Sequence, residues 1–304
     1  QCAPGDSIVI RAGIYTKKLL IEKTVSVFGE EGAVIDVGGK GDCAVIGAPN
    51  VTLKGLTLRN TGTDTEKSDT AIWLRKNAAD ALVEDNVVEN SLFGIWVHGA
   101  PRPRLINNRI TGLPDFQRND RGDGIHLWNT KGAEIRGNTV EHSRDGIYME
   151  LSAMGVVSEN TIAHSRYSVH TMWCDGTEFI DNEARSNLVG LALMFSKKIG
   201  ARGNVLYDNQ THGILLVQVT RGFAIDNAII GNTKGLFVYN SLYNEIRDNF
   251  VARNNLGLHY WGGAEDNEIT GNAFVENEIQ AKFVASHDQV WDGNYWSDYF
   301  GWDA

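Results

Sequence analysis

Short stretches in which apolar and polar residues alternate recur along the chain at a nearly constant spacing. In residues 146–150, Gly-Ile-Tyr-Met-Glu, the apolar Ile147 and Met149 occupy every second position. Alternation with period two is typical of a β-strand that buries one face. An asparagine recurs in phase with these stretches at intervals of 22 or 23 residues, with a single interval of 30, at Asn86, Asn108, Asn138, Asn160, Asn182, Asn204, Asn227, Asn249, Asn272 and Asn294. A fixed period of this length indicates a repeat protein.

A repeat of about 22 residues is too short for a pair of helices and has the length of one coil of a parallel β-solenoid. Leucine-rich repeats have a similar length, but their recurring leucines are absent. We therefore predict an all-β chain folded as a right-handed, single-stranded parallel β-helix, with roughly ten to thirteen coils stacked about 4.8 Å apart. Equivalent asparagines should then form an internal ladder of amide hydrogen bonds, as they do in cross-β structures.

The sequence predicts one β-helical domain over residues 1–304. Residues 1–50 fit the N-terminal coils, and residues 51–304 carry the regular repeats. Polar side loops are expected near residues 61–69 and 112–122, and the second loop accounts for the long interval. We also expect native sequence upstream of the first coil, because an uncovered end coil is an open sheet edge.

Recurring Gly-aliphatic pairs place two columns of side chains on the outside of one sheet. With the aliphatic residue pointing inward, the next residue points outward. The first outward column is Trp96, His126, Tyr148, His170, Ala192, Leu215, Phe237 and His259. The second is His98, Trp128, Glu150, Met172, Met194, Val217, Tyr239 and Trp261. A solvated face should be rich in Thr, Lys, Glu and Ser, so this composition predicts a binding surface, with coverage by the protein's own loops as the alternative.

Candidate metal ligands lie within these columns at His126, His170, Met172, Met194 and Glu150. Outward side chains on adjacent strands are roughly 5 Å apart, and thioether plus imidazole is a donor set that selects Cu(I). In the alternative interpretation, the methionines only pad a partner interface. The aromatic residues expected to bind a partner are Trp128, Trp261, Tyr148 and Trp96.

The cysteines Cys2, Cys43 and Cys174 are too few for a disulfide scaffold and have no metal-binding spacing. The spacing leaves open whether Cys2 and Cys43 pair. Cys174 stands in a column of small turn residues and is expected to be a buried thiol in place of serine. His142 and His164 occupy equivalent turn positions, either as a solvated ladder or as a chelating pair.

Asp123 and Asp145 occupy the same column on successive coils, beside Arg144. Adjacent carboxylates share protons, which acid-base chemistry on a sugar could use. The alternative function is therefore a polysaccharide lyase, epimerase or hydrolase. Because such an Asp-Arg ladder is more often structural, we assign no catalytic residue and expect a protein that is not an enzyme.

Charge and length exclude several classes. The 304 residues carry a net charge of -10, which disfavours nucleic acid and anionic lipid as partners. No apolar run approaches the roughly 20 residues that a membrane-spanning helix needs. The given sequence does not include a signal peptide, and this does not indicate in which cellular compartment the protein resides.

Several segments together resemble the NosD family. They read GDGIHLWNTKGAEIRGNTV, RDGIYMELS, RYSVHTMWC, GLALMFSKKI, GLFVYN and GNYWSDYFGWD. The Asn-Gly pattern alone is shared with many carbohydrate-acting solenoids. The His-Thr-Met-Trp and Leu-Met-Phe-Ser-Lys-Lys segments are more specific, and the resemblance covers most of the chain after residue 71.

The resemblance implies a periplasmic β-helical protein that accompanies an ABC-type transporter and assists copper delivery to the copper centres of nitrous oxide reductase. It implies four partners: the permease, its ATPase, a copper-chaperone lipoprotein and the reductase. It does not imply catalysis, and it carries no residue-by-residue copper motif onto this chain. The expected cargo is Cu(I), bound transiently. Family members also tend to extend beyond a terminus such as that at residue 304.

Overall fold

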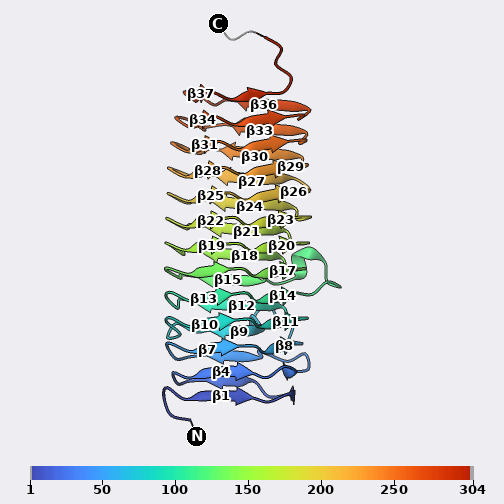
Figure 1. Ribbon diagram of the computed structural model, residues 1–304, viewed down its shortest axis with the longest axis vertical. Coiled ribbons are helices and arrows are strands. Elements are labelled where there is room, and N and C mark those ends of the chain that lie inside the picture. Colours follow the sequence, from blue (N-terminus) through green and yellow to red (C-terminus); the bar gives the residue numbers. More distant parts are fainter. Residues whose placement is uncertain (1, 302–304) are drawn as a thin grey trace. The chain divides into compact units, whose positions relative to one another are not determined.

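The computed structural model describes residues 2–301, which form short parallel strands joined by turns (Figure 1). By their internal contacts they fall into two compact units, Gln1–Arg166 and Tyr167–Ala304, which are described separately. Each unit is a parallel β-helix whose successive strands join the first, second and third of three parallel sheets in turn. The predicted fold class and coil length are confirmed. A single domain over residues 1–304 stays a prediction.

The first unit contains three parallel sheets. Its first sheet is β1 (Ser7–Ile10), β4 (Ser26–Gly29), β7 (Thr52–Lys54), β10 (Leu82–Glu84), β13 (Arg104–Ile106), β16 (Glu134–Arg136) and β19 (Val156–Ser158). Its second is β2 (Gly13–Tyr15), β5 (Ala33–Asp36), β8 (Thr57–Arg59), β11 (Val87–Glu89), β14 (Arg109–Thr111), β17 (Thr139–Glu141) and β20 (Thr161–Ala163). Its third is β3 (Leu19–Ile21), β6 (Ala44–Ile46), β9 (Thr70–Leu74), β12 (Phe93–His98), β15 (Ile125–Trp128) and β18 (Asp145–Glu150).

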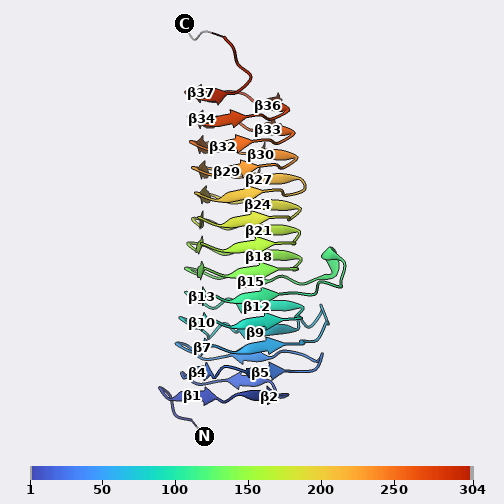
Figure 2. The same cartoon turned by 45° about the vertical axis from the view of Figure 1, so that its right-hand side comes forward.

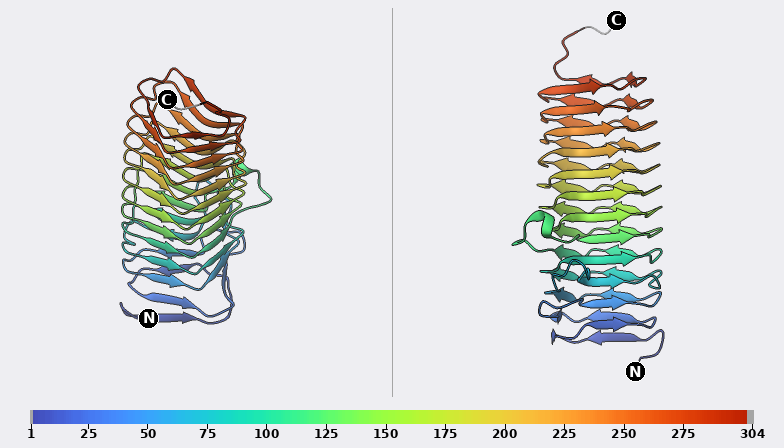
Figure 3. Two further views of the ribbon diagram at one scale, coloured as in Figure 1. Left: turned by 45° about the horizontal axis from the view of Figure 1, so that its top comes forward. Right: turned by 180° about the vertical axis from the view of Figure 1, so that it is seen from behind.

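The second unit repeats this arrangement, and Figure 3 shows its strands from two further sides. Its first sheet is β22 (Glu178–Ile180), β25 (Gly200–Arg202), β28 (Phe223–Ile225), β31 (Glu245–Arg247), β34 (Glu268–Thr270) and β37 (Val290–Asp292). Its second is β23 (Glu183–Arg185), β26 (Val205–Tyr207), β29 (Ala228–Ile230), β32 (Phe250–Ala252), β35 (Ala273–Val275) and β38 (Tyr295–Trp296). Its third is β21 (Tyr167–Met172), β24 (Val189–Met194), β27 (His212–Val217), β30 (Lys234–Tyr239), β33 (Leu256–Trp261) and β36 (Ile279–Val284).

Strand alternation determines which side chains enter the core. In the third sheet of the first unit, Ile95, Ile125 and Ile147 pair in register on β12, β15 and β18, and all three are fully buried. Met149 is buried in the same way, as the alternation predicts. Because the period within a strand is two, this register sends the intervening residues of β12, β15 and β18 outward.

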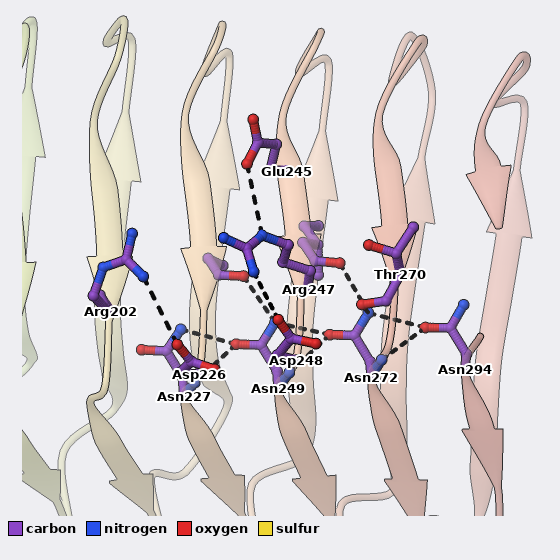
Figure 4. A network of polar contacts seen from close by, with 12 residues as sticks. Arg202, Asp226, Asn227, Glu245, Arg247, Asp248, Asn249, Thr270, Asn272 and Asn294 are labelled. Carbon is purple, nitrogen blue, oxygen red and sulfur yellow. Dashed lines mark hydrogen bonds and ion pairs between the residues drawn. The ribbon is translucent and has the colours of Figure 1, made fainter. Parts of the chain in front are cut away.

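The predicted asparagine ladder is present in both units. In the first, the side-chain amide of Asn86 donates to Asn108 Oδ1 at 3.1 Å, and Asn108 donates to Asn138 at 3.0 Å. In the second, Asn227 donates to Asn249 at 2.9 Å, as Figure 4 shows. The ladder satisfies amide groups that would otherwise be unpaired inside the coils.

The recurring glycines before the inward aliphatic residues are required by close approach between coils. A Cβ atom on Gly190 would lie 2.4 Å from the carbonyl oxygen of Gly213. One on Gly235 would lie 2.5 Å from that of Gly257. No other residue fits without displacing a strand, which explains the Gly-aliphatic pattern of the sequence.

Both predicted side loops leave the first unit as loops. The longer one, 112–122, projects beside β15 (Figure 2) and contains the short 3-10 helix η1 (Arg118–Asp120). Arg121 ties this loop together by donating to the carbonyl oxygens of Phe116 at 3.0 Å and Pro114 at 2.9 Å. In loop 61–69, Lys67 pairs with Asp64.

Candidate functional site

The outward columns of the third sheet exist in each unit. In the first unit, β12, β15 and β18 align Trp96 with His126 and Tyr148, and their second outward positions align Trp128 with Glu150. Their order is therefore the one that the repeat spacing predicts. The columns of the second unit are likewise in register.

The side chains of the first outward column of the first unit, Trp96, His126 and Tyr148, are largely covered by one another although they point away from the core. His126 is only 6% exposed because the indole of Trp96 stacks on it, with ring centroids 3.9 Å apart and planes 14° apart. Tyr148 contacts the other side of His126 edge-on at 4.9 Å. Trp96 itself packs against a small apolar cluster of Leu92, Phe93 and Leu113. The sequence identified these side chains as outward but not how thoroughly they cover one another.

His126 is held by a carboxylate. Its Nδ1 atom lies 2.8 Å from Oδ2 of Asp123, which is fully buried. Arg144 donates to both oxygens of Asp123, at 3.1 and 3.0 Å. A carboxylate on Nδ1 fixes the orientation of the ring and directs Nε2 to any ligand, the arrangement that supports metal-binding histidines. The columns of the repeat do not predict this pairing, because they place Asp123 and His126 in different columns; the i, i+3 spacing of the two residues across the start of β15 is the signal that the sequence contains.

Asp145 occupies the position equivalent to Asp123 on the next coil. It is fully buried, and Arg166 donates to its two oxygens at 2.8 and 2.7 Å. A bidentate pair of this kind engages both oxygens of the carboxylate and leaves little of it free to act on a substrate. The geometry of Asp123 and Asp145 therefore matches the structural ladder that the sequence also allowed.

Three of the five candidate metal ligands lie in the second unit. Met172 on β21 and Met194 on β24 are directly in register, and both are partly exposed. His170 lies two residues before Met172 on the same face and is 8% exposed. The ring of Tyr167 meets that of His170 edge-on at 4.9 Å. The repeat therefore brings two thioethers and one imidazole onto a single patch of adjacent strands.

The turn after this patch carries two aromatic residues, of which Trp173 is exposed and Phe195 is partly exposed. Trp173 follows Met172, Phe195 follows Met194, and their rings stack at 5.6 Å. Both residues have positive φ, 54° and 52°, a conformation that bulky side chains rarely adopt. Trp173 is 49% exposed. Strand alternation gives no signal for this pair, because both residues lie in the turn that follows the strands.

Cys174 closes the same turn. It is fully buried, and its backbone N–H donates to the Ser196 hydroxyl at 2.9 Å, while Ser196 donates to the Met194 carbonyl at 2.7 Å. The expectation of a buried thiol in a serine column is confirmed. Cys2, Cys43 and Cys174 are all free thiols in this structure.

The donor chemistry limits what metal the molecule could hold. Within residues 2–301, no three His, Cys, Asp or Glu side chains converge as a metal-binding group. A site for a harder ion is therefore not evident in this range. Met172, Met194 and His170 would suit Cu(I), which accepts thioethers. The remaining candidates, His126 and Glu150, belong to the first unit.

The candidate partner-binding aromatics differ in accessibility. Trp261 is 47% exposed, and Trp128 is partly exposed and packs on His98 with ring centroids 4.6 Å apart. Trp96 and Tyr148 are half-buried against His126. Of the four, Trp261 therefore offers the most exposed aromatic surface.

His142 and His164 stack in a turn of the first unit, with ring centroids 5.1 Å apart and planes 13° apart. Burial and the neighbouring charges of His164 and Arg121 lower the pKa of His142. Nearly parallel rings cannot direct two nitrogens at one ion without turning. This geometry favours the turn-ladder interpretation.

Two protein-family models match parts of the chain. One, described as "Periplasmic copper-binding protein (NosD)", matches residues 106–301. Another, described as "Protein of unknown function (DUF1565)", matches residues 18–172. Within the described residues, no helix is both long and apolar enough to cross a membrane.

Solved structures share the architecture. A family 28 exopolygalacturonase from Yersinia enterocolitica has a TM-score of 0.69 at 12% identity, over 96% of this chain and 73% of that one. A periplasmic alginate epimerase, AlgG, has a TM-score of 0.62 at 14% identity, over 97% of this chain and 79% of that one. At such low identity, these likenesses show the fold alone.

Sequence relatives are much closer. A "Probable ABC transporter binding protein NosD" of Pseudomonas aeruginosa is 38% identical over 97% of this chain and 73% of its own length. The protein of the same name from Stutzerimonas stutzeri is 39% identical over 96% of this chain and 71% of its own. The chain therefore belongs to the NosD family.

Proposed function

We propose that this chain is a periplasmic accessory protein of an ABC-type transporter that carries Cu(I) as cargo for the copper centres of nitrous oxide reductase. The family description names copper and the periplasm, and the relatives are named as transporter binding proteins. The observation that carries the proposal is the registered pair Met172 and Met194 beside His170. No enzymatic step is assigned to the chain.

Cu(I) is a cargo that must be released, so a shallow site of weak donors suits it. Two thioethers and an imidazole bind Cu(I) through soft ligands without the charge of a thiolate. The turn residues Trp173, which is exposed, and Phe195, which is partly exposed, place a stacked aromatic pair directly after the two methionines. Such a pair would pack against the protein that delivers or receives the ion.

His126 and Glu150 are proposed as secondary donors of the first unit. Asp123 leaves Nε2 of His126 as its available nitrogen. The Trp96 stack restricts access to this ring. We therefore expect Met172 and Met194 to contribute more to copper affinity than His126 does.

Partner binding is proposed for Trp128, Tyr148 and Trp96 of the first unit, which are partly exposed, and for Trp261 of the second unit, which is exposed. The expected partners are the permease and its ATPase, a copper-chaperone lipoprotein and the reductase. Copurification of the chain with the permease and ATPase, followed by anaerobic metal analysis, tests this assembly. Absence of the chain from that complex would contradict the transporter role.

Anaerobic titration with Cu(I) against a competing chelator tests the cargo site. The variants Met172→Leu and Met194→Leu keep volume and remove sulfur, so the dissociation constant should rise at least about tenfold. Met154→Leu is the matched control, because Met154 is a 62% exposed methionine outside the patch. Equal Cu(I) affinity in all three variants would show that the methionine pair does not hold the ion.

A further inference from the structure

A second polar cluster lies on the third sheet of the second unit, on strands beyond β21 and β24. His212 of β27 is in register with Lys234 of β30, and His259 of β33 is in register with Lys282 of β36. Phe237 lies among them. Its ring meets His212 edge-on at 5.4 Å and His259 edge-on at 5.0 Å, and the Lys234 ammonium lies 4.5 Å from its centroid.

The two lysines of this cluster are not neutralised. Within residues 2–301, no carboxylate lies within ion-pair distance of Lys234 or Lys282. Several arginines of the same unit do pair with carboxylates, as Figure 4 shows for Arg202 with Asp226 at 3.7 Å and for Arg247 with Asp248 at 2.7 Å. Arg253 likewise pairs with Glu276 at 3.1 Å. Lys234 and Lys282 therefore place two positive charges near one another that no carboxylate of the described residues neutralises.

His259 is the second observation that indicates a ligand here. Its side chain is 3% exposed, and neither ring nitrogen has a hydrogen-bond partner among the described residues. Leaving a buried polar group unpaired costs about 1–3 kcal/mol, so native proteins seldom do so without a reason. The side chains around it include Lys282 and Trp261, which are long and exposed and can move to admit a ligand.

The electrostatics of the cluster agree with an anion rather than a metal cation. Burial, followed by the charges of Lys234 and Lys282, lowers the pKa of His259. Burial, followed by Lys234 and His259, lowers the pKa of His212 to about 4. Burial and Lys282 lower the pKa of Lys234. Burial and neighbouring positive charges therefore disfavour the protonated forms of His259, His212 and Lys234. A nearby negative charge would stabilise these protonated forms, whereas the positive charge of Cu(I) would be repelled by them.

We propose that Lys234, Lys282 and His259 form a seat for a carboxylate that an acidic segment of a partner protein contributes. A protein partner is favoured because the seat adjoins Tyr239 and Trp261, which are in register and 40% and 47% exposed. These aromatic side chains would receive apolar residues of the same segment. The whole chain carries a net charge of -10, so this positively charged patch differs in sign from the chain as a whole. It would orient an acidic partner segment as the two proteins approach one another. This surface goes beyond the proposed copper site.

Carboxylate binding should be coupled to protonation of His259. The charged groups that face it are Lys234 of β30, Lys282 of β36 and, when protonated, His212 of β27. A bound carboxylate adds a negative charge, so it raises the pKa of His259 relative to the free protein. Binding therefore takes up a proton, and the affinity for an acidic segment should increase as pH falls from 8 to 5.5.

Fluorescence anisotropy with the full chain tests this proposal. The probe is a fluorescein-labelled peptide, Glu-Leu-Glu-Glu-Leu-Glu, with the corresponding Gln peptide as its uncharged counterpart. We expect the Glu peptide to bind at least tenfold more tightly than the Gln peptide, and to bind more tightly at pH 5.5 than at pH 8. The pH dependence should disappear in His259→Phe, which retains both lysines.

Charge variants separate the seat from general attraction. Lys282→Gln removes an exposed charge, so its effect cannot be attributed to unfolding, and Lys234→Gln with Lys282→Gln should weaken Glu-peptide binding at least tenfold. Lys197→Gln with Lys198→Gln removes two exposed lysines elsewhere in the same unit and should leave binding unchanged. Equal binding by the two double variants would overturn the proposal. Inorganic phosphate that competes as strongly as the peptide would overturn the protein-partner assignment and leave a small-anion site.

Discussion

The side-chain amide of Asn227 donates to Oδ1 of Asn249 at 2.9 Å, while Oδ1 of Asn227 accepts hydrogen bonds from the backbone and side-chain N–H groups of Asn204. Each rung of the ladder therefore supplies both a donor and an acceptor to its neighbours. Asn227 is 1% exposed, so water cannot replace these bonds. The ladder makes the stability of one coil depend on the coils on both sides of it.

Asn227→Ala should lower the free energy of unfolding by roughly 3 kcal/mol, because several buried groups lose their partners together. Urea denaturation followed by circular dichroism measures this change. Asn255→Ala is the control, since Asn255 is exposed on the same unit. Equal midpoints for the two variants would contradict a structural role for the ladder.

Gly213→Ala should destabilise the second unit by about 1–3 kcal/mol, the usual range for overpacking. A Cβ atom there would lie 2.3 Å from Cγ2 of Ile229 and 2.8 Å from the carbonyl oxygen of Gly235. Gly262→Ala should be tolerated, because its nearest neighbour would be 4.0 Å away. Thermal denaturation of both variants distinguishes close approach from a general glycine effect, and the prediction fails if Gly262→Ala is the less stable of the two.

Asp145→Asn should cost stability without removing an enzymatic activity. Weakening the buried pair leaves Arg166 without its carboxylate, for which roughly 3–5 kcal/mol is typical. Asp80→Asn, at an exposed pair with Arg102, should leave stability close to that of the wild type. Incubation of each protein with a uronate polymer provides the second readout. Turnover that Asp145→Asn abolishes while the fold persists would establish the polysaccharide enzyme instead.

Thiol labelling of the native protein should modify one cysteine. Cys43 and Cys174 are fully buried, so neither is accessible to the reagent, and burial also raises the pKa of Cys43 to about 12. Cys2 is partly exposed. Mass spectrometry should find one label in buffer, three in denaturant and none on native Cys2→Ser. Rapid labelling of native Cys174 would indicate that the turn opens and that this thiol could join a copper site.

His212 should make the second unit sensitive to acid. Its pKa falls from 6.5 in the unfolded chain to about 4 in the fold, mainly through burial. Between these values the unfolded state binds more protons, so the stabilising effect of the neutral ring is complete above pH 6.5 and declines as pH falls toward 4. The whole effect is at most about 3 kcal/mol. His212→Phe should flatten this part of the stability curve, whereas His287→Phe, at an exposed histidine, should not.

Much of the fold could be predicted because each coil of a β-solenoid repeats the same spacing of residues along the sequence. The spacing of Asn86, Asn108 and Asn138 identifies the ladder despite the eight-residue insertion between the last two. A second ladder in the other unit escaped notice, in which Asn187 donates to Asn209 and Asn209 to Asn232. Each asparagine of this second ladder follows one of the first ladder, Asn182, Asn204 or Asn227, by five residues. This constant offset is the signal that the sequence contains.

The candidate site was less predictable, because column membership does not fix burial. Sequence position made His126 and Phe237 equivalent outward residues, yet His126 is 6% exposed and Phe237 is partly exposed. The difference arises from the size of the neighbouring side chains, since Trp96 covers His126. The contact between Asp123 and His126 also depends on the conformation of the turn before β15, which the repeat spacing does not give.

By itself, the sequence determined the coil length, the inward and outward alternation and the pairing of Met172 with Met194, because each follows from a repeat read along one dimension. Only the tertiary structure decided which outward side chains meet solvent and which charges remain unpaired. Those properties depend on how side chains of unequal size and opposite charge fill the space between coils. For that reason Asp145 finds Arg166 while Lys234 and Lys282 find no carboxylate among the described residues.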